Sequence, residues 1–237
     1  MEVIAIHCDH CKEKYCTQKV SIFSGLTGEE NAQVHHLIQR FSYQKGEHLI
    51  MDGQSFDRLM IVHSGQLKAY RDTVDGKQQI LHIFGPGDFL GERTLFTHTE
   101  ASYTVEALTS VTVCTIHRQA FQSLLGQYPS ISKKILEVLS DRLSQLEKTV
   151  ESMGAKTIDK RVSAVLVDFA EKFGRKQKNS IELDLPLNRE GIANFIGLTR
   201  ETVTRKMKRL EREGIIRPVG NKKIEILDYE ALQESSE

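Results

Sequence analysis

Four cysteines are the residues of this chain whose type and spacing could support metal or redox chemistry. Three lie close together, at Cys8, Cys11 and Cys16 in a C-x2-C-x4-C arrangement, and the fourth is Cys114 in the run VTVCTI. A gap of two residues lets two thiolates converge on one ion or cluster, and a distant cysteine completes the coordination if the fold brings it close. The sequence therefore predicts one site made by the four thiolates.

The spacing leaves the bound group open. Zinc accepts four thiolates, or a set in which His7 or His10 replaces one of them, and an iron–sulfur cluster accepts the same four. In a reducing compartment such clustering indicates a metal or redox site rather than a disulfide framework. The alternative for Cys114 is a buried thiol in a strand that takes no part in the site.

A helix-turn-helix is predicted over residues 187–210, which read LNREGIANFIGLTRETVTRKMKRL. Gly197 can adopt the positive φ that the turn between two short helices requires, and the hydroxyl of Thr199 can cap the second helix. Apolar residues recur at helical spacing, at Ile192, Ala193 and Ile196 on the first helix and at Val203, Met207 and Leu210 on the second.

The polar face of the second helix could read DNA, because Arg and Glu recognise guanine acceptors and the cytosine amino group. A solvated charged face is the other interpretation. The chain has no net charge, whereas residues 186–223 hold ten Arg or Lys against four Glu, a local charge of +6 that suits phosphates. DNA reading is therefore favoured. The predicted DNA-binding residues are Arg200, Glu201, Thr204, Arg205, Lys208 and, further on, Lys222.

A β-hairpin is predicted directly after this motif. Residues 214–217 and 223–226 are strand-like runs that flank the turn Pro218-Val219-Gly220-Asn221. Lys222 and Lys223 at the tip are suited to phosphates. Together with the helix-turn-helix, the hairpin predicts a winged helix.

A long dimerisation helix is predicted over residues 129–154. Its apolar residues follow a 3-4-3-4-3 spacing, which places them along one narrow seam as heptad a and d positions. A narrow seam favours pairing with a second copy over packing on the chain's own domain, and a two-fold reader of DNA needs two copies. The predicted dimer interface comprises Leu136, Leu139, Leu143, Leu146, Val150 and Met153.

The N-terminal half shows short apolar runs broken by glycines, and Asp75-Gly76 is a strong hairpin signal. This pattern predicts a β-barrel or jelly roll. No Ser/His/Asp or paired-carboxylate arrangement stands out, so we expect no enzyme. The expected fold is α+β, divided into a cysteine-rich segment (1–20), a β-roll sensor domain (21–128), the dimerisation helix (129–154) and a winged helix-turn-helix domain (155–237).

No apolar run approaches the ~18 residues that span a membrane. The N-terminus has too short an apolar stretch for a signal peptide. These features predict a cytoplasmic protein with no membrane partner, in which thiols are normally reduced.

The order of β-roll, long helix and winged helix-turn-helix resembles the CRP/FNR regulator family, and in particular its fumarate–nitrate reduction branch. AIHCDHC at residues 5–11, SVTVCTI around Cys114 and GLTRETVTR at 197–205 carry the match. The resemblance implies a cyclic-nucleotide-binding-like β-roll and an oxygen-labile four-iron, four-sulfur cluster on Cys8, Cys11, Cys16 and Cys114. It also implies that the cluster supports a DNA-binding homodimer, with RNA polymerase as a further partner.

Two features bear on the branch within this family. The cyclic-nucleotide branch keeps a Gly-Glu pair and an Arg-Ser pair, but here Gly91 and Glu92 are followed by Ala101-Ser102. Because the cyclic phosphate would lack its bidentate arginine, we expect no cyclic AMP binding. The gap from Cys11 to Cys16 is one residue shorter than in the best-known members.

The reading helix combines two patterns of the family. Glu201, Thr204 and Arg205 resemble E-x-x-S-R, and Arg200 adds the first residue of R-E-x-x-x-R. We expect a palindrome with TGA in each half-site, in which Arg205 reads guanine, Glu201 the opposing cytosine and Arg200 a second guanine.

Two alternatives accompany this hypothesis. The same regulator could carry zinc, or no cofactor and a reversible disulfide between Cys114 and an N-terminal cysteine. From a different class, the chain could be a metal-binding or ligand-binding adaptor whose helix-turn-helix mediates protein contacts only.

Overall fold

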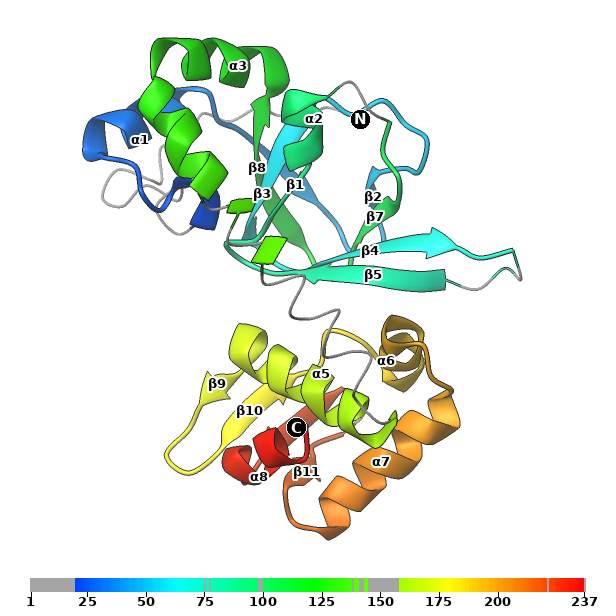
Figure 1. Cartoon of the computed structure of the whole chain (residues 1–237). Helices are drawn as coiled ribbons and strands as arrows, with labels where there is room; N and C mark the ends of the chain where they lie inside the picture. The colour runs from blue at the N-terminus through cyan, green and yellow to red at the C-terminus, as the bar shows by residue number, and fades with distance from the viewer. Residues whose placement is uncertain are drawn as a thin grey trace. The chain divides into compact units, whose positions relative to one another are not determined.

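The computed structural model describes residues 20–74, 76, 78–97, 100–137, 139–140, 143–144, 158–220 and 222–236. The chain divides into two compact units, residues 1–71 with 83–148 and residues 72–82 with 149–237. Figure 1 labels their helices and strands. The fold is α+β, as the sequence predicts. The predicted domain boundaries stay predictions, and the division at residue 148 falls within the predicted dimerisation helix.

The N-terminal half folds as a β-roll of two four-stranded antiparallel sheets, in which residues 78–82 of strand β5 are grouped with the second unit. One sheet has the order β1-β8-β3-β6 and the other β2-β7-β4-β5. Their strands are β1 (Gln39–Tyr43), β2 (His48–Ile50), β3 (Arg58–Ser64), β4 (Leu67–Asp72), β5 (Gln78–Phe84), β6 (Phe89–Leu90), β7 (Thr104–Ala107) and β8 (Val111–His117). Each begins within or next to an apolar run of the sequence, because alternate side chains of a strand must reach a core.

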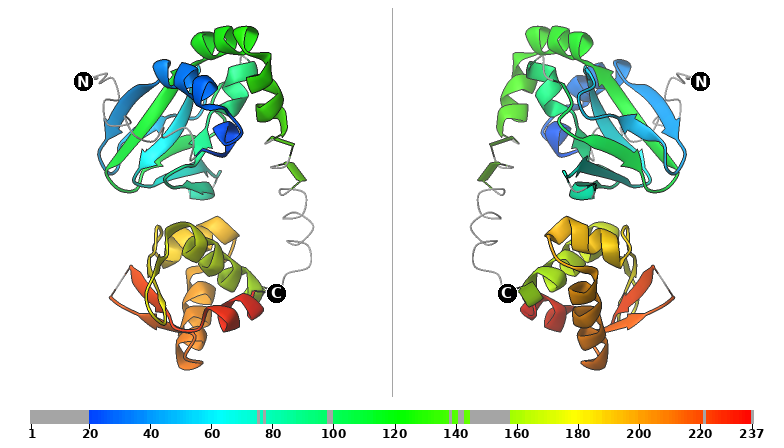
Figure 2. Two further views of the ribbon diagram at one scale, coloured as in Figure 1. Left: turned by 90° about the vertical axis from the view of Figure 1, so that its left-hand side faces the viewer. Right: turned by 90° about the vertical axis from the view of Figure 1, so that its right-hand side faces the viewer.

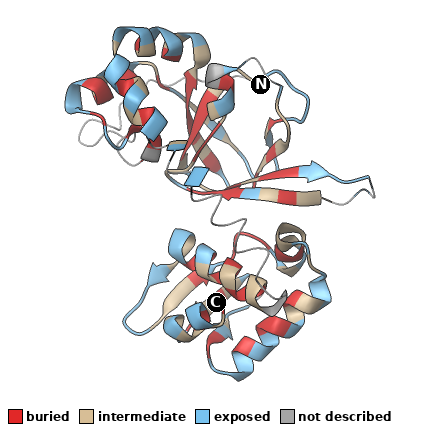
Figure 3. Ribbon diagram, viewed as in Figure 1, coloured by how far each residue is buried: buried red, intermediate tan, exposed pale blue. Residues whose placement is uncertain are grey.

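The β-roll encloses one core between its sheets and has a second core on the outer face of the first sheet. Val111 and Val113 of β8 belong to the inner core. Cys114 and Ile116 lie on the other face of the strand and belong to the outer core. Figure 3 shows buried residues along the central strands of the roll. Strand β8 is therefore buried on both faces.

Helices cover the outer core. They are the 3-10 turn η3 (Ser21–Phe23), α1 (Gly28–His36) and α3 (Arg118–Gln127), followed by helical residues 129–137. Helix α2 (Glu92–Phe96) lies between β6 and β7. In Figure 1 and in both views of Figure 2, α1 and α3 lie side by side against the roll. Phe23 and Phe121 meet edge to face there, with ring centroids 6.1 Å apart.

The start of the predicted dimerisation helix packs on this outer core. Ile131 and Ile135 are fully buried in it, and Leu139 is partly buried against it. On the same helix Leu136 and Leu143 are 64% and 59% exposed. Residues 139–140 and 143–144 are also helical. Leu146, Val150 and Met153 lie outside the described residues, so the seam stays a prediction.

The second unit is a winged helix. It contains α5 (Ile158–Phe173), β9 (Arg175–Lys176), β10 (Ile181–Asp184), α6 (Arg189–Ile196), α7 (Arg200–Arg212), β11 (Ile216–Pro218), β12 (Lys223–Ile226) and α8 (Tyr229–Glu234). Its antiparallel sheet has the order β11-β12-β10-β9. The predicted wing corresponds to β11 and β12, and β10, which the sequence analysis did not predict, pairs with β12 from Ile181 to Asp184.

A buried carboxylate joins α1 to the long helix. Glu30 Oε2 accepts hydrogen bonds from Thr27 N and Lys134 Nζ, each at 2.8 Å, and Oε1 accepts one from Ser130 Oγ at 2.5 Å. The hydrogen bond from Lys134, then those from Ser130 and Thr27, lower the pKa of Glu30 to about 2. Because the folded pKa lies below the ordinary 4.5, the ionised Glu30 stabilises the fold above pH 4.5, and this contribution is lost as the pH falls toward 2.

We predict that Glu30→Gln lowers the free energy of unfolding by about 1.5–3 kcal/mol at pH 7, the usual range for hydrogen bonds to a charged group. The difference from the unsubstituted chain should shrink below pH 4.5, because the unfolded chain then takes up a proton at Glu30 before the folded chain does. Urea unfolding followed by circular dichroism from pH 7 to pH 3 measures this. A difference that stays constant over that range would contradict the assignment.

Candidate nucleic-acid interface and cysteine site

Local sequence features position the recognition helix α7. Asn188 caps α6 by accepting from Gly191 N at 2.8 Å, and α6 ends at Gly197, whose φ of +67° is left-handed. The hydroxyl of Thr199 then accepts from Thr202 N at 3.2 Å and caps α7. The helices pack through Ile192, Ala193, Val203, Met207 and Leu210, all buried. Ile196 is half-buried.

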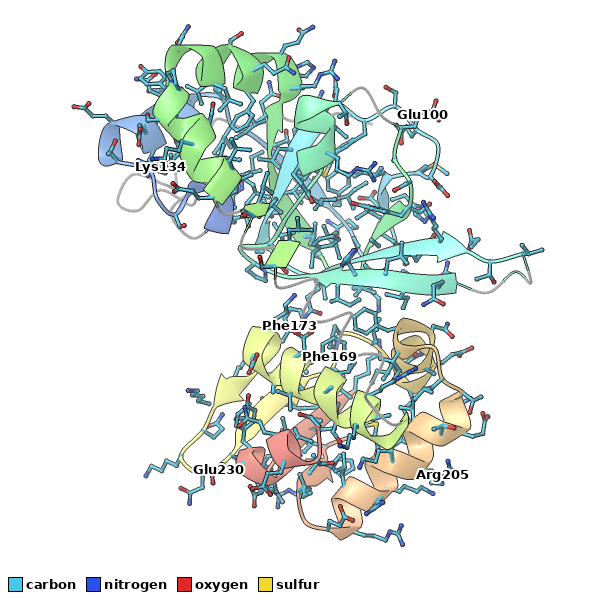
Figure 4. All side chains as sticks on the ribbon, in the orientation of Figure 1. Glu100, Lys134, Phe169, Phe173, Arg205 and Glu230 are labelled. Atoms are coloured by element: carbon cyan, nitrogen blue, oxygen red, sulfur yellow. The ribbon has the colours of Figure 1, made fainter. Side chains whose placement is uncertain are left out.

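The opposite face of α7 carries the predicted DNA-reading side chains on one surface. Arg200, Glu201, Arg205 and Lys208 are exposed and Thr204 is half-exposed. These five residues line a shallow open depression together with Glu211 and Arg212. Figure 4 labels Arg205 on this helix. The structure therefore brings five of the six predicted DNA-binding residues together. The sixth, Lys222, is exposed beside β12 on the wing.

Several of the Arg and Lys residues that make up the local charge of +6 form hydrogen bonds or ion pairs within the second unit. Lys206 is only 7% exposed and donates to Ser235 Oγ at 3.1 Å, and Arg209 Nε donates to Glu213 at 2.8 Å. On the sheet, Arg217 pairs with Glu225 and Lys223 with Glu182 at 2.5 Å. Hydrogen bonds from Ser180 and then from Arg217 lower the pKa of Glu225.

Five further cations of this region are available to a nucleic acid. Within the described part of the chain, no hydrogen bond or ion pair engages the side chains of Arg200, Arg205, Lys208, Arg212 or Lys222. Four of these five residues belong to the α7 surface. Positive charge is thus concentrated where the predicted base-reading residues lie.

Lys206 counts toward the local charge of +6, although its position in the sequence indicates burial. Lys206 lies three residues after Val203 and four before Leu210, on the apolar stripe of α7. Its ammonium reaches Ser235, whose hydroxyl lies 2.8 Å from that of Ser163. This polar contact joins α7 to the C-terminal residues and to α5.

Cys114 occupies a sealed position in the first unit. It lies in the middle of β8, opposite Arg40 of β1 and Ile61 of β3, and is fully buried in the outer core. Val20 and Phe23, from the segment that follows the N-terminal cysteines, are buried in the same core. Cys8, Cys11 and Cys16 lie outside the described residues. Across the described ranges, no cluster of three or more His, Cys, Asp or Glu could hold a metal.

A small cavity lies where the resemblance places a cyclic-nucleotide site. Gly91, Glu92, Glu100, Ala101 and Ser102 are among the residues that line it. Arg93, which is exposed, is the one cation of the lining, and position 101 offers only a methyl group. The cavity holds about 50 Å³, whereas ligand pockets usually hold roughly 300 Å³ or more.

Comparison with known proteins identifies the chain. The cyclic nucleotide-binding domain family matches residues 40–128, and the Crp-like helix-turn-helix domain family matches residues 160–235. A probable transcriptional regulator, flp, of Lacticaseibacillus casei is 32% identical over 92% of this chain and 97% of its own length. This chain belongs to the CRP/FNR family of transcription regulators. It is a DNA-binding regulator and not an enzyme, and the adaptor alternative is set aside.

Both branches of the CRP/FNR family are represented among its relatives. A CRP-like cAMP-activated global regulator of Mycobacterium tuberculosis is 29% identical over 90% of this chain and 95% of its own. A fumarate and nitrate reduction regulatory protein of Vibrio cholerae is 28% identical over 97% of this chain and 90% of its own. Overall identity therefore does not separate the branches.

A solved structure agrees with the fold. A CRP/FNR-family transcriptional regulator from Thermus thermophilus has a TM-score of 0.68 and 26% identity, covering 83% of this chain and 97% of that one. Among the described residues, no helix has the length and apolar character that crossing a membrane requires.

We predict that Lys208→Met and Lys206→Met differ in their effect on the salt dependence of DNA binding. When the protein binds, the exposed Lys208 should release about one counterion from the DNA. Replacing Lys208 therefore reduces the slope of log K against log salt by about 1. The buried Lys206 should leave the slope unchanged. Fluorescence anisotropy with a nonspecific duplex at several salt concentrations measures both. An equal reduction by the two substitutions would refute this distinction.

Proposed function

We propose that this regulator is a homodimer whose DNA binding responds to oxygen or redox state through a four-iron, four-sulfur cluster on Cys8, Cys11, Cys16 and Cys114. The observation that carries the proposal is the burial of Cys114 in the core that also buries Val20 and Phe23. Cys16 precedes Val20 by four residues, and four residues span at most about 14 Å. The length of the chain thus allows Cys16 to reach the outer core that contains Cys114.

The surroundings of Cys114 suit an oxygen-labile group. Apolar side chains of α1, α3 and the sheet enclose its position and keep bulk water from it, and burial is one of the factors that tune a cluster. When bound, the cluster would be the group that reacts with oxygen. The chain's own residues supply four thiolates, one of them held rigidly by a strand that is paired on both edges.

The alternative keeps the same regulator with zinc, or with a disulfide between Cys114 and an N-terminal cysteine. A disulfide would require the outer core to open, because Cys114 is fully buried and a partner sulfur must come to about 2 Å from its own. A bound group also needs room beside the buried sulfur, so metal and sulfide analysis, and not the burial of Cys114, distinguishes the two.

The homodimer is supported by two exposed leucines. Leu136 and Leu143 lie seven residues apart, two turns along the helix, and are 64% and 59% exposed. Large apolar side chains in this arrangement are stabilised when a second copy covers them. Pairing would also give the two recognition helices that a palindrome requires.

The expected target is a palindrome with TGA in each half-site. Arg205 would read guanine, Glu201 the opposing cytosine and Arg200 a second guanine, with Thr204 between them and Lys208 and Lys222 on phosphates. We expect cyclic AMP not to be the effector, because the lining of the small cavity has Ala101 in place of an arginine. RNA polymerase is the expected protein partner.

We predict that protein purified anaerobically contains iron and acid-labile sulfide, and that Cys114→Ala loses most of both. Val113→Ala is the matched control, because it removes a buried side chain from the same strand on the opposite core and should retain them. Metal and sulfide analysis together with visible absorbance measures this. Zinc without iron or sulfide would exclude the cluster.

We predict that Arg205→Ala weakens binding to the TGA palindrome by about 1–3 kcal/mol and relaxes preference at the guanine it reads. Lys222→Ala should weaken binding to all sequences about equally, since a phosphate carries no sequence information. Competition binding with duplexes substituted at each half-site base separates these effects. Uniform weakening by both variants would contradict the assignment of Arg205.

A further inference from the structure

We propose that α1 carries the state of the cysteine site to the dimerisation helix, with Glu30 as the positioning residue. Two adjacent residues of α1 make the connection. Asn31 holds the chain that arrives from the cysteine-rich segment, and Glu30 holds the first turns of the long helix. This inference rests on the proposed function, because it assigns the route by which the cysteine site alters dimerisation.

Asn31 ties the incoming segment to α1. Its side chain is fully buried, and its amide nitrogen donates to the carbonyl oxygens of Leu26 and Thr27, each at 3.1 Å. Just before this point, Val20, Ile22 and Phe23 share the outer core with Cys114. A displacement of that segment therefore pulls on the N-terminus of α1.

Glu30 ties α1 to the long helix at two points. Its carboxylate accepts from Ser130 Oγ at 2.5 Å and from Lys134 Nζ at 2.8 Å, and Figure 4 labels Lys134 on that helix beside α1. Ser130 and Lys134 are four residues apart and so lie one above the other on one face. Two directional bonds one turn apart fix the rotation of the helix about its axis.

This rotation determines where the exposed leucines point. Leu136 follows Lys134 by two residues, about 200° around the helix, and is 64% exposed while Ile135 is buried. Apolar contacts of Ile131 and Ile135 with the core are non-directional and tolerate a small rotation or slide. The Glu30 carboxylate supplies directional bonds between α1 and this helix, and thereby sets the orientation of Leu136 and Leu143.

The Glu30→Gln variant separates this role from helix capping. Glu30 also completes a capping box with Thr27, whose backbone N–H donates to its carboxylate, and glutamine serves equally well at that position. The variant should therefore keep the cap while weakening the bond to Lys134, because the charge is removed. Lys134→Gln removes the same bond from the other side. Glu29→Gln is the matched control, since Glu29 is exposed on the same helix and no hydrogen bond or ion pair in the described part of the chain engages its side chain.

The experiment measures the dimer dissociation constant of the full chain by sedimentation, before and after exposure of anaerobic protein to air. The ratio of the two constants should be at least about tenfold for the unsubstituted chain, an ordinary size for such coupling. We expect it to fall to about threefold or less in Glu30→Gln and in Lys134→Gln. Glu29→Gln should keep the full ratio.

Visible absorbance of each anaerobic variant shows whether the cysteine site is intact. Unchanged absorbance with a reduced ratio supports the proposal. A full ratio in Glu30→Gln, or an equal reduction in Glu29→Gln, overturns it and leaves the proposed function standing. Loss of absorbance in Glu30→Gln also overturns it, because Glu30 would then stabilise the site itself. No response to air in the unsubstituted chain overturns the inference and the proposed function together.

Discussion

The enclosure of β8 is the constraint on which the sensor half of this molecule depends. The strand is hydrogen-bonded to β1 on one edge and to β3 on the other, and a core covers each of its faces. Cys114 therefore has a fixed position and direction, toward the helices. Any group that uses its sulfur must form within the outer core, and the elements that build this core also carry the first turns of the long helix.

The DNA-binding half depends on a different balance, between charges that are neutralised within the unit and charges that are not. Ion pairs with Glu213, Glu225 and Glu182 occupy three cations at the edges of the domain. Arg200, Arg205 and Lys208 on α7 have no such partner among the described residues. A modest number of cations, placed on one helix face and at the wing, is what allows a chain with no net charge to bind a polyanion.

Local signals were sufficient for much of the fold and for the reading helix. Gly197 predicted the turn of the helix-turn-helix because glycine readily adopts a positive φ. Thr199 predicted the cap because its hydroxyl can accept from a backbone N–H at the start of the helix. The Glu30 contacts were not predicted because Ser130 and Lys134 lie 100 and 104 residues away in the chain. Strand β10 was missed since its partner β12 lies some forty residues further on. The three N-terminal cysteines fall outside the described residues, so the site they predict is still a prediction.

The central claim is that the cysteine site controls DNA binding, and one titration tests it most directly. The affinity of anaerobically purified full-length protein for a TGA palindrome is measured before and after exposure to air, at fixed salt and protein concentration. If the cysteine site controls DNA binding, the affinity should fall by at least about tenfold in air, because the dimer is lost. Equal affinity under both conditions would contradict it.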